Sequence, residues 1–242
     1  MNKVLKDFLW PVVILVALTA LIQVTGLDLY LEGRFFQTGT GWVYGDHNPW
    51  IFLYNYGVFP SLLLASGALL AVVASLFSAR FYIYRKCALF FLLLMLLGPG
   101  LMVNTVLKDH WGRPRPRQMQ VFGGASSFHQ VWERCQGRMA GTSFPSGHAS
   151  AAFYLMAPYF VWRQSSRRKA RIFLSAGIGY GLLMGVARMV QGGHFPSDIL
   201  WAGGVVYLVG LSLYYLLRLD RGVLLVPKAV PRRLPVTAEP TE

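Results

Sequence analysis

Charged residues and cysteines are scarce in this chain, and each shortage excludes a class of protein. Only 14% of the 242 residues are charged and 55% are apolar, against about 25% and roughly 45–50% in an ordinary soluble domain. That composition excludes an intrinsically disordered chain. Two cysteines are too few for a disulfide scaffold, and the apolar heptads of a coiled coil are missing. An integral membrane protein remains, because the apolar residues fall in long runs.

The apolar runs predict an all-α bundle of six transmembrane helices. A run of about 20 residues is long enough to cross the hydrocarbon core of a bilayer, and five runs have that length. A sixth run is short and contains Pro158, but the number of crossings and the distribution of charge both require a span there. The first run follows two lysines, as in a signal peptide, but no A-x-A cleavage site follows it, so we expect an uncleaved anchor. The six expected spans cover residues 8–26, 57–77, 88–107, 149–162, 172–190 and 199–217.

The basic residues orient this bundle. The chain has 23 lysines and arginines and 10 acidic residues, for a formal net charge of +13, which by itself is typical of proteins that bind nucleic acid or anionic lipid. Fifteen of these basic residues flank the apolar runs on one side. The positive-inside rule makes that side cytoplasmic, together with both termini, so the charge reflects topology and we expect no nucleic acid as partner. We predict one membrane domain over residues 1–221 and a disordered, proline-rich cytoplasmic tail over 222–242.

Basic residues also occur on the predicted outer side, where the positive-inside rule disfavours them. The outer loop 108–148 carries six of them, and Arg188 stands at the outer end of a nearly uncharged helix, six residues before His194. Arginines at helix ends can simply extend their side chains to the membrane surface, and that alternative stays open. The other interpretation is an anion-binding site at the outer ends of the third to sixth helices. The six loop residues are Lys108, Arg113, Arg115, Arg117, Arg134 and Arg138.

Two segments of the outer loop carry groups suited to a phosphate. Residues 108–116 read KDHWGRPRP, in which Lys108 offers a point charge and Arg115 a planar fork for two phosphate oxygens. Residues 144–150 read FPSGHAS, directly before the fourth expected helix. Ser146, Gly147 and His148 would place a hydroxyl, backbone N–H groups and an imidazole at the N-terminus of that helix, where the helix dipole favours an anion. An ordinary N-cap by Ser146 is the alternative.

A third segment, residues 187–198, reads ARMVQGGHFPSD and supplies a candidate nucleophile. His194 and Asp198 are four residues apart, and Pro196 can begin a helix, so Asp198 is able to bind one imidazole nitrogen and leave the other as a lone pair. A histidine with such an orienting partner is an activated nucleophile. A lone histidine at a helix start is more often a polar interface residue, but the nearby Arg188 favours the functional interpretation.

The order and spacing of the three segments resembles the type 2 phosphatidic acid phosphatase superfamily, which also contains the vanadium haloperoxidases. The shared pattern is a lysine, six residues and Arg-Pro; then Pro-Ser-Gly-His; then an arginine, five residues, a histidine, three residues and an aspartate. One departure is Ala187, where the family usually has serine. The segment 111–116, followed by Phe122, Gly123 and Gly124, is similar to bacterial members that dephosphorylate lipid A.

The resemblance implies a role for each matching residue. His194 attacks phosphorus and forms a phosphohistidine, Asp198 holds the tautomer of His194, and His148 protonates the leaving oxygen and then activates water. No metal or other cofactor is implied, and the sequence lacks the paired carboxylates that a two-metal phosphatase needs. The residues implied to hold the phosphate oxygens are Lys108, Arg115, Ser146, Gly147 and Arg188.

The expected activity is that of a lipid phosphate phosphatase in a bacterial inner membrane, with its site facing the periplasm and the lipid chains of its substrate in the bilayer. Lipid A, undecaprenyl pyrophosphate and glycerophospholipid phosphates are all candidate substrates. Two alternatives stay open: a lipid phosphotransferase with the same intermediate, and a non-catalytic protein that binds or transports lipid. The two histidines argue against the latter, because binding alone needs only cations. A vanadium haloperoxidase is disfavoured by the six spans.

Overall fold

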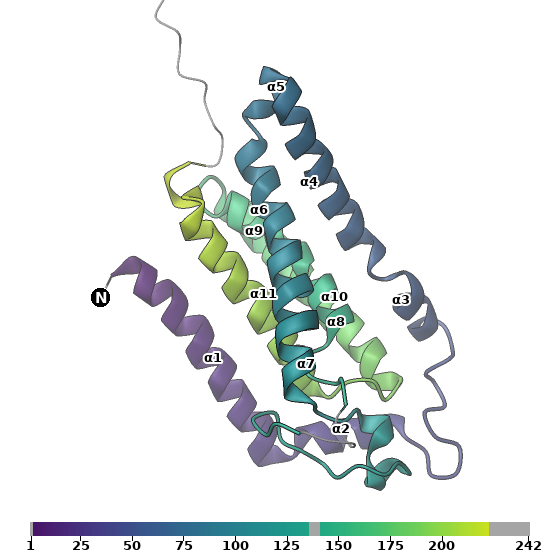
Figure 1. Ribbon diagram of the computed structural model, residues 1–242. Helices are drawn as coiled ribbons and strands as arrows, with labels where there is room; N and C mark the ends of the chain where they lie inside the picture. The colour runs from purple at the N-terminus through teal and green to yellow at the C-terminus, as the bar shows by residue number, and fades with distance from the viewer. Residues whose placement is uncertain (1, 136–140, 223–242) are drawn as a thin grey trace, which may run out of the picture.

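The structure, a computed structural model, describes residues 2–135 and 141–222. Within these ranges it consists of helices and connecting loops, with two isolated β-bridges and no strand, as the predicted all-α class requires. Most helices run along one long axis, whereas α2 (Leu27–Phe35) lies across one end of the bundle (Figure 1). Except for Gly222, the predicted tail 222–242 lies outside the described residues, and so does Arg138.

Five stretches of helix in the described chain are long and apolar enough to cross a membrane. Each contains most or all of one of the five long runs predicted from the sequence. The second begins seven residues earlier than predicted, at Trp50, and the third ends eleven residues later, at Gln118. The helices that form them are α1 (Lys3–Thr25), α3 with α4 (Trp50–Tyr56 and Phe59–Phe77), α6 (Arg85–Met95) with the π-helical segment Leu96–Leu107 and α7 (Lys108–Trp111), α10 (Arg167–Val190) and α11 (Pro196–Leu216).

The sixth span, predicted at 149–162, corresponds to a shorter and interrupted helix. It consists of α8 (Gly147–Phe153), a 3-10 turn (Tyr154–Met156) and α9 (Ala157–Trp162). Pro158 lies in the first turn of α9, where its missing N–H costs little. These three pieces contain sixteen residues. At roughly 1.5 Å per residue they form a helix about 24 Å long, which is shorter than the ~30 Å thickness of a hydrocarbon core. Most of these residues are buried, and the helix packs against α10 and α11.

Helix α10 approaches this short helix through a row of glycines at every fourth position. Gly177 lies against the backbone of Met156, and Gly181 lies against the ring of Phe153, so a side chain at either position would collide with these atoms. Gly185 approaches α11 in the same way. In a bilayer, where apolar side chains gain little by leaving lipid, small residues let helices come close enough to pack.

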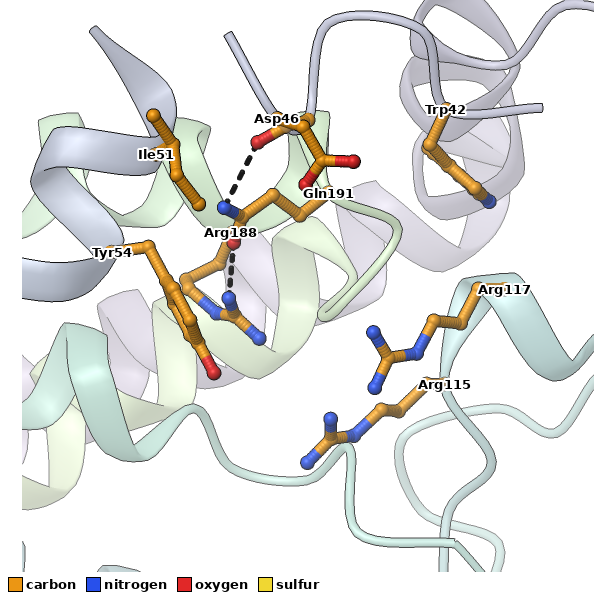
Figure 2. A pocket seen from close by; sticks show the side chains of 9 residues that line it. Trp42, Asp46, Ile51, Tyr54, Arg115, Arg117, Arg188 and Gln191 are labelled. Atoms are coloured by element: carbon orange, nitrogen blue, oxygen red, sulfur yellow. Dashed lines mark hydrogen bonds between the residues drawn. The ribbon is translucent and has the colours of Figure 1, made fainter. Parts of the chain in front are cut away.

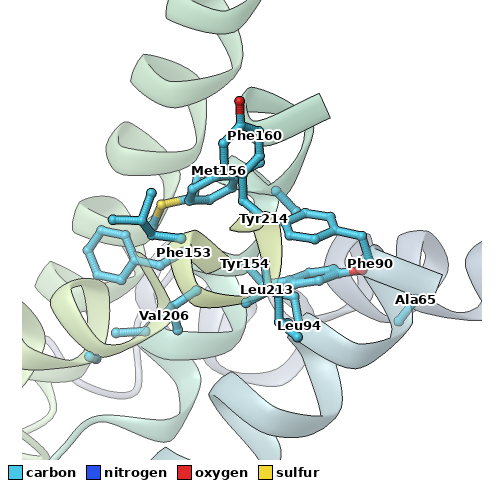
Figure 3. Packing of buried hydrophobic residues seen from close by; sticks show 14 of the residues in the cluster. Ala65, Phe90, Leu94, Phe153, Tyr154, Met156, Phe160, Val206, Leu213 and Tyr214 are labelled. Carbon is cyan, nitrogen blue, oxygen red and sulfur yellow. The ribbon is translucent and has the colours of Figure 1, made fainter. Parts of the chain in front are cut away.

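A cluster of buried apolar residues lies between α6, α8, α9 and α11 (Figure 3). The rings of Phe90 and Phe160 are 5.6 Å apart between centroids. The buried Tyr154 directs its hydroxyl to the backbone oxygen of Phe91 at 3.1 Å. This packing fixes the spacing of the helices whose ends carry the chemically interesting side chains.

Those ends gather beside α2, together with the loops that follow α2 and α7 (Figure 1). The turn α5 (Ala79–Tyr82) lies at the opposite end of the bundle (Figure 1). Backbone hydrogen bonds tie the loops to the helix ends: Arg117 N donates to Gly192 O at 3.1 Å, and Ser146 N donates to Asp198 O at 3.3 Å.

Candidate active site

The three segments singled out in the sequence meet at the end of the bundle where α2 lies. They line a cavity of about 380 Å³, together with residues of α3, α8 and the π-helical segment. Two of the eight predicted site residues, Ser146 and Asp198, lie fully buried behind its wall. The other six line it: Lys108, Arg115, Gly147, His148, Arg188 and His194.

The π-helical segment Leu96–Leu107 positions Lys108. It contains Pro99, which has no backbone N–H to donate within the helix. Asn104 Nδ2 donates to Pro99 O at 2.7 Å, and Asn104 Oδ1 accepts from Lys108 Nζ at 2.8 Å. A Cβ on Gly147 would lie 3.0 Å from that ammonium and still closer to Asn104. Glycine at position 147 therefore allows the first turn of α8 to reach the lysine.

Two guanidinium groups complete the positive wall. Arg115 donates to Thr142 Oγ1 at 3.0 Å. Arg188 lies at the end of α10 and is only 4% exposed. Its Cζ lies over the ring of Tyr54, 4.6 Å from the centroid, and its guanidinium donates to the side chain of Gln191 (Figure 2). Among the described residues neither arginine forms an ion pair with a carboxylate, and Arg188 Nε is buried without a hydrogen-bond partner. Unpaired positive charge of this kind, buried in the case of Arg188, is suited to an anionic ligand.

His148 lies in the first turn of α8. Its ring stacks on Tyr54, with centroids 5.0 Å apart. Burial, and then the three cations around the cavity, lower the pKa of His148 from 6.5 to about 4. The neighbouring Ser146 is fully buried, and its Oγ accepts from Ala149 N at 3.4 Å. Ser146 is therefore an N-cap, the alternative that the sequence left open, and it does not line the cavity.

His194 lies in the short connection between α10 and α11. Its Nδ1 is 2.6 Å from the backbone oxygen of Ser143. Because a carbonyl oxygen can only accept, Nδ1 carries the proton and Nε2 is left with the lone pair. Burial and the three neighbouring cations lower the pKa of His194 well below its usual value. The imidazole is thus neutral, as a nucleophile must be.

Asp198 does not make the hydrogen bond predicted for it. Its Oδ2 is 3.9 Å from His194 Nδ1, too far for a hydrogen bond. The same oxygen accepts from Ser143 Oγ at 2.5 Å and from Phe195 N at 2.9 Å. Because Ser143 supplies both the hydroxyl that binds Asp198 and the carbonyl that binds His194, the aspartate orients the histidine through Ser143.

Arg113, which the sequence left without a role, is the centre of this arrangement. Its side chain is fully buried and donates to Asp198 Oδ1 at 2.6 Å, to Asp28 Oδ2 of α2 at 2.8 Å and to Ser197 Oγ at 2.7 Å. Its backbone oxygen accepts from Ser143 N at 2.9 Å. One residue therefore fixes both Asp198 and Ser143, and it connects α2 to the wall of the cavity.

Four residues of the site were missed by sequence reasoning: Tyr54, Asn104, Arg113 and Ser143. Asn104 carried a signal, because a polar side chain within an apolar run one turn before Lys108 is a functional candidate. Arg113 also carried one, since it begins the Arg-Pro-Arg-Pro repeat. The contact of Arg113 with Asp28 joins positions 85 residues apart, which no local spacing indicates. Tyr54 and Ser143 had no local signal.

The arrangement suits phosphoryl chemistry. A neutral imidazole with a free lone pair, a second imidazole, and a wall of one ammonium and two guanidinium groups surround the same space. In the described ranges there is no group of three or more His, Cys, Asp or Glu residues placed to hold a metal ion. The positive charge that faces a ligand here comes from Lys108, Arg115 and Arg188.

Comparison with known proteins identifies the family of this chain. A family model described as the PAP2 superfamily matches residues 88–221. The chain is 34% identical over 193 residues to the lipid A 4'-phosphatase of Francisella tularensis subsp. novicida (strain U112), covering 79% of this chain and 86% of that protein. It is 30% identical over 175 residues to phosphatidylglycerophosphatase B of Bacillus subtilis (strain 168), covering 70% and 75%. A crystal structure of a transmembrane PAP2 type phosphatidylglycerolphosphate phosphatase from Bacillus subtilis is 25% identical, with a TM-score of 0.46 and coverage of 91% and 96%.

Proposed function

Because the chain belongs to the PAP2 superfamily, we propose that it hydrolyses a phosphate ester on a lipid headgroup through a phosphohistidine intermediate. The observation that carries this proposal is the pair of histidines on one cation-lined cavity. His194 has its Nδ1 proton bound by Ser143 O and presents a lone pair, and His148 stands at the N-terminus of α8. Binding alone does not require an oriented, neutral imidazole.

In the first step His194 Nε2 attacks phosphorus, the bond from phosphorus to the lipid oxygen breaks, and His148 gives its proton to that oxygen. The lipid leaves as an alcohol. Lys108, Arg115 and Arg188, with the backbone N–H of Gly147, stabilise the charge on the other phosphate oxygens. A bound phosphate dianion counters the cations that lower the pKa of His148, so the substrate itself promotes protonation of the acid.

In the second step a water molecule attacks the phosphohistidine. His148 takes the proton from water, the bond from phosphorus to Nε2 breaks, and inorganic phosphate leaves. Asp198, Ser143 and Arg113 keep the ring of His194 in one tautomer through both steps. No step uses a metal ion.

Membrane placement follows from the apolar helices and the charge pattern. We propose six crossings, with residues 149–162 as the sixth, both termini in the cytoplasm and the cavity open to the periplasm of a bacterial inner membrane. The relatives are named as phosphatases of lipid A and of phosphatidylglycerophosphate. The substrates we propose are accordingly lipid A, a glycerophospholipid phosphate or undecaprenyl pyrophosphate.

The test is phosphate release by the purified full chain in detergent, in the presence of EDTA, from a panel of these lipids. We expect release from at least one lipid, inhibition by vanadate, which mimics a five-coordinate phosphorus, and no release by His194→Ala. His129→Ala is the matched control, because within the described residues the side chain of His129 hydrogen-bonds only to Ser127 O of its own loop.

Three results would contradict the proposal. Activity that EDTA removes and magnesium restores would point to metal catalysis. Lipid binding without turnover would indicate a binding or transport protein. Phosphate transfer that occurs only with an added acceptor lipid would make the protein a phosphotransferase.

A further inference from the structure

A second cavity, of about 300 Å³, adjoins the catalytic cavity (Figure 2). The two cavities share Tyr54, Arg115 and Arg188 as wall residues, so a single ligand can occupy both. The mechanism proposed above uses none of the other residues in this second cavity. They are Trp42, Gly45, Asp46, Ile51, Arg117 and Gln191.

Arg117 supplies a cation beyond those that face the catalytic phosphate. Its backbone N–H is fixed by Gly192 O at 3.1 Å, but its side chain is exposed and makes no hydrogen bond within the part of the chain that the structure describes. Figure 2 shows the guanidinium groups of Arg115 and Arg117 next to each other, facing Arg188 across the cavity. Arg117 therefore has its donors available for a ligand.

The opposite wall combines an aromatic ring, an amide and a carboxylate. Trp42 packs against Phe36 and Phe122, whose ring centroids lie 5.6 and 5.4 Å from its own. Gly192 lies against the indole so closely that any side chain there would collide with it. Gln191 is held by Arg188 and by Gly45 O, which accepts from its Nε2 at 3.1 Å. The Asp46 carboxylate is exposed and makes no hydrogen bond with the described residues.

We propose that this second cavity binds the sugar ring of a phosphorylated glycolipid whose phosphate occupies the catalytic cavity. The indole of Trp42 packs against the C–H face of such a ring. Asp46 accepts hydrogen bonds from the hydroxyl and amide groups of the sugar, Arg117 donates to them, and Gln191 can do both. The inference rests on the proposed function and names the headgroup that its active site selects.

The position of the leaving oxygen supports this placement. Tyr54 stacks on His148, the acid that protonates that oxygen, and Tyr54 also lines the second cavity. The group attached to the leaving oxygen is thus directed past Tyr54 into the second cavity. A glycerol headgroup is too small to fill it. The second phosphoryl group of a diphosphate would meet Arg117 but has no apolar face to place against Trp42, whereas a sugar ring contacts both residues.

The test compares three substrates with purified full chain in detergent micelles: an acylated glucosamine phosphate, phosphatidic acid and undecaprenyl diphosphate. The variants are Asp46→Asn and Arg117→Gln, both at exposed side chains with no hydrogen bonds to lose among the described residues. We expect each variant to lower the ratio of kcat/KM for the sugar lipid over phosphatidic acid about tenfold, which corresponds to roughly one good hydrogen bond to a charged group. Arg34→Gln, an exposed arginine of α2 outside both cavities, is the matched control and should keep the wild-type ratio.

An unchanged ratio in both variants overturns the inference while the phosphatase activity itself stands. A loss confined to undecaprenyl diphosphate also overturns it, because the cavity would then hold a second phosphoryl group. Absence of turnover of all three lipids by the wild-type protein would contradict the proposed function instead, so the two failures are distinguishable.

Discussion

His148 and His194 face the same cavity and the same cations, but their ring nitrogens have different partners. The protonated Nδ1 of His194 is bound by Ser143 O, which leaves Nε2 as a nucleophile. His148 has no such fixed partner among the described residues; its ring stacks on Tyr54. This difference supports the separate roles proposed above, nucleophile for His194 and general acid for His148, and these roles are testable through the leaving group.

We expect His194→Ala to abolish turnover of every substrate, because it removes the covalent route. His148→Ala should lose about 10²–10⁴ in rate on an alkyl phosphate, whose alkoxide needs a proton, but far less on an aryl phosphate. The measurement is the burst of phenol released as the phosphoenzyme forms, since His148 also acts in the second step. Equal losses for both variants with both leaving groups would mean that the assigned roles are wrong.

Glu32 is a fully buried carboxyl on α2 with no hydrogen-bond partner among the described residues. Burial, and then the nearby carboxylates of Asp198 and Asp28, raise its pKa well above 4.5. The folded protein thus retains a proton that the unfolded chain releases as the pH rises above about 4.5. In this range the folded state binds more protons, so the contribution of Glu32 to stability decreases as pH increases.

Glu32→Gln removes this contribution and keeps the side-chain shape. We expect the Tm of the variant, relative to wild type, to increase as the pH is raised from 4.5 to 8, as followed by thermal unfolding in detergent. Glu133→Gln, the same change at an exposed carboxylate of the outer loop, should show no such trend. A Tm difference for Glu32→Gln that stays constant with pH would show that Glu32 is ionised in the folded protein.

Sequence patterns located the residues that face the ligand better than those that support them. Lys108, His148 and Arg188 stand out because charges and imidazoles at the ends of apolar runs are unusual. Asp198 lies near His194, as expected, but without the direct hydrogen bond, because their four-residue spacing permits that bond without requiring it. Ser143 lies on another segment and competes for both groups, and no spacing along the chain shows that competition.

At the level of the helices, α10 offers a test of close packing with a built-in control. Gly177 lies against the backbone of Met156, which cannot move aside, whereas no atom lies near enough to Gly179 to contact an added Cβ. We expect Gly177→Ala to destabilise the protein by about 1–3 kcal/mol through overpacking. Gly179→Ala should be neutral or stabilise by about 0.5–1 kcal/mol, because alanine favours the helix.

The measurement is the Tm of each variant in the same detergent. If Gly177→Ala were as stable as Gly179→Ala, the close approach of α10 to the short helix would be wrong. The row of glycines made this packing predictable from the sequence. The 3-10 turn between α8 and α9 was less predictable, because hydropathy records where a helix is apolar and not whether its hydrogen bonds continue.

At the level of the whole molecule, topology is open to a labelling test. Cys135 is buried, so its own reactivity says little. Exposed positions are better reporters: Ser127 in the loop beside the cavity and Ser165 between α9 and α10. In a background with both native cysteines replaced, we expect Ser127→Cys to react with a membrane-impermeant thiol reagent in cells with a permeabilised outer membrane. Ser165→Cys should react only after lysis, and the reverse pattern would invert the orientation.

The number and order of the long spans were predictable because hydrophobic length is a strong and local signal. The arrangement of the helices around one cavity was not, since it depends on contacts such as that of Arg113 with Asp28, between segments far apart along the chain. Fold class followed from composition, whereas the support of the site followed only from tertiary contacts.

The Arg113 network also determines when, during synthesis, this protein acquires its chemistry. Asp28 leaves the ribosome early, Arg113 near the midpoint, and His194 and Asp198 late. A nascent chain that ends before α11 contains Asp28, Arg113 and His194. It lacks Asp198, the carboxylate that holds the other side of Arg113 and accepts from the hydroxyl of Ser143. If the proposed function holds, we expect phosphatase activity only once the last helix has joined the bundle and Asp198 has completed this network.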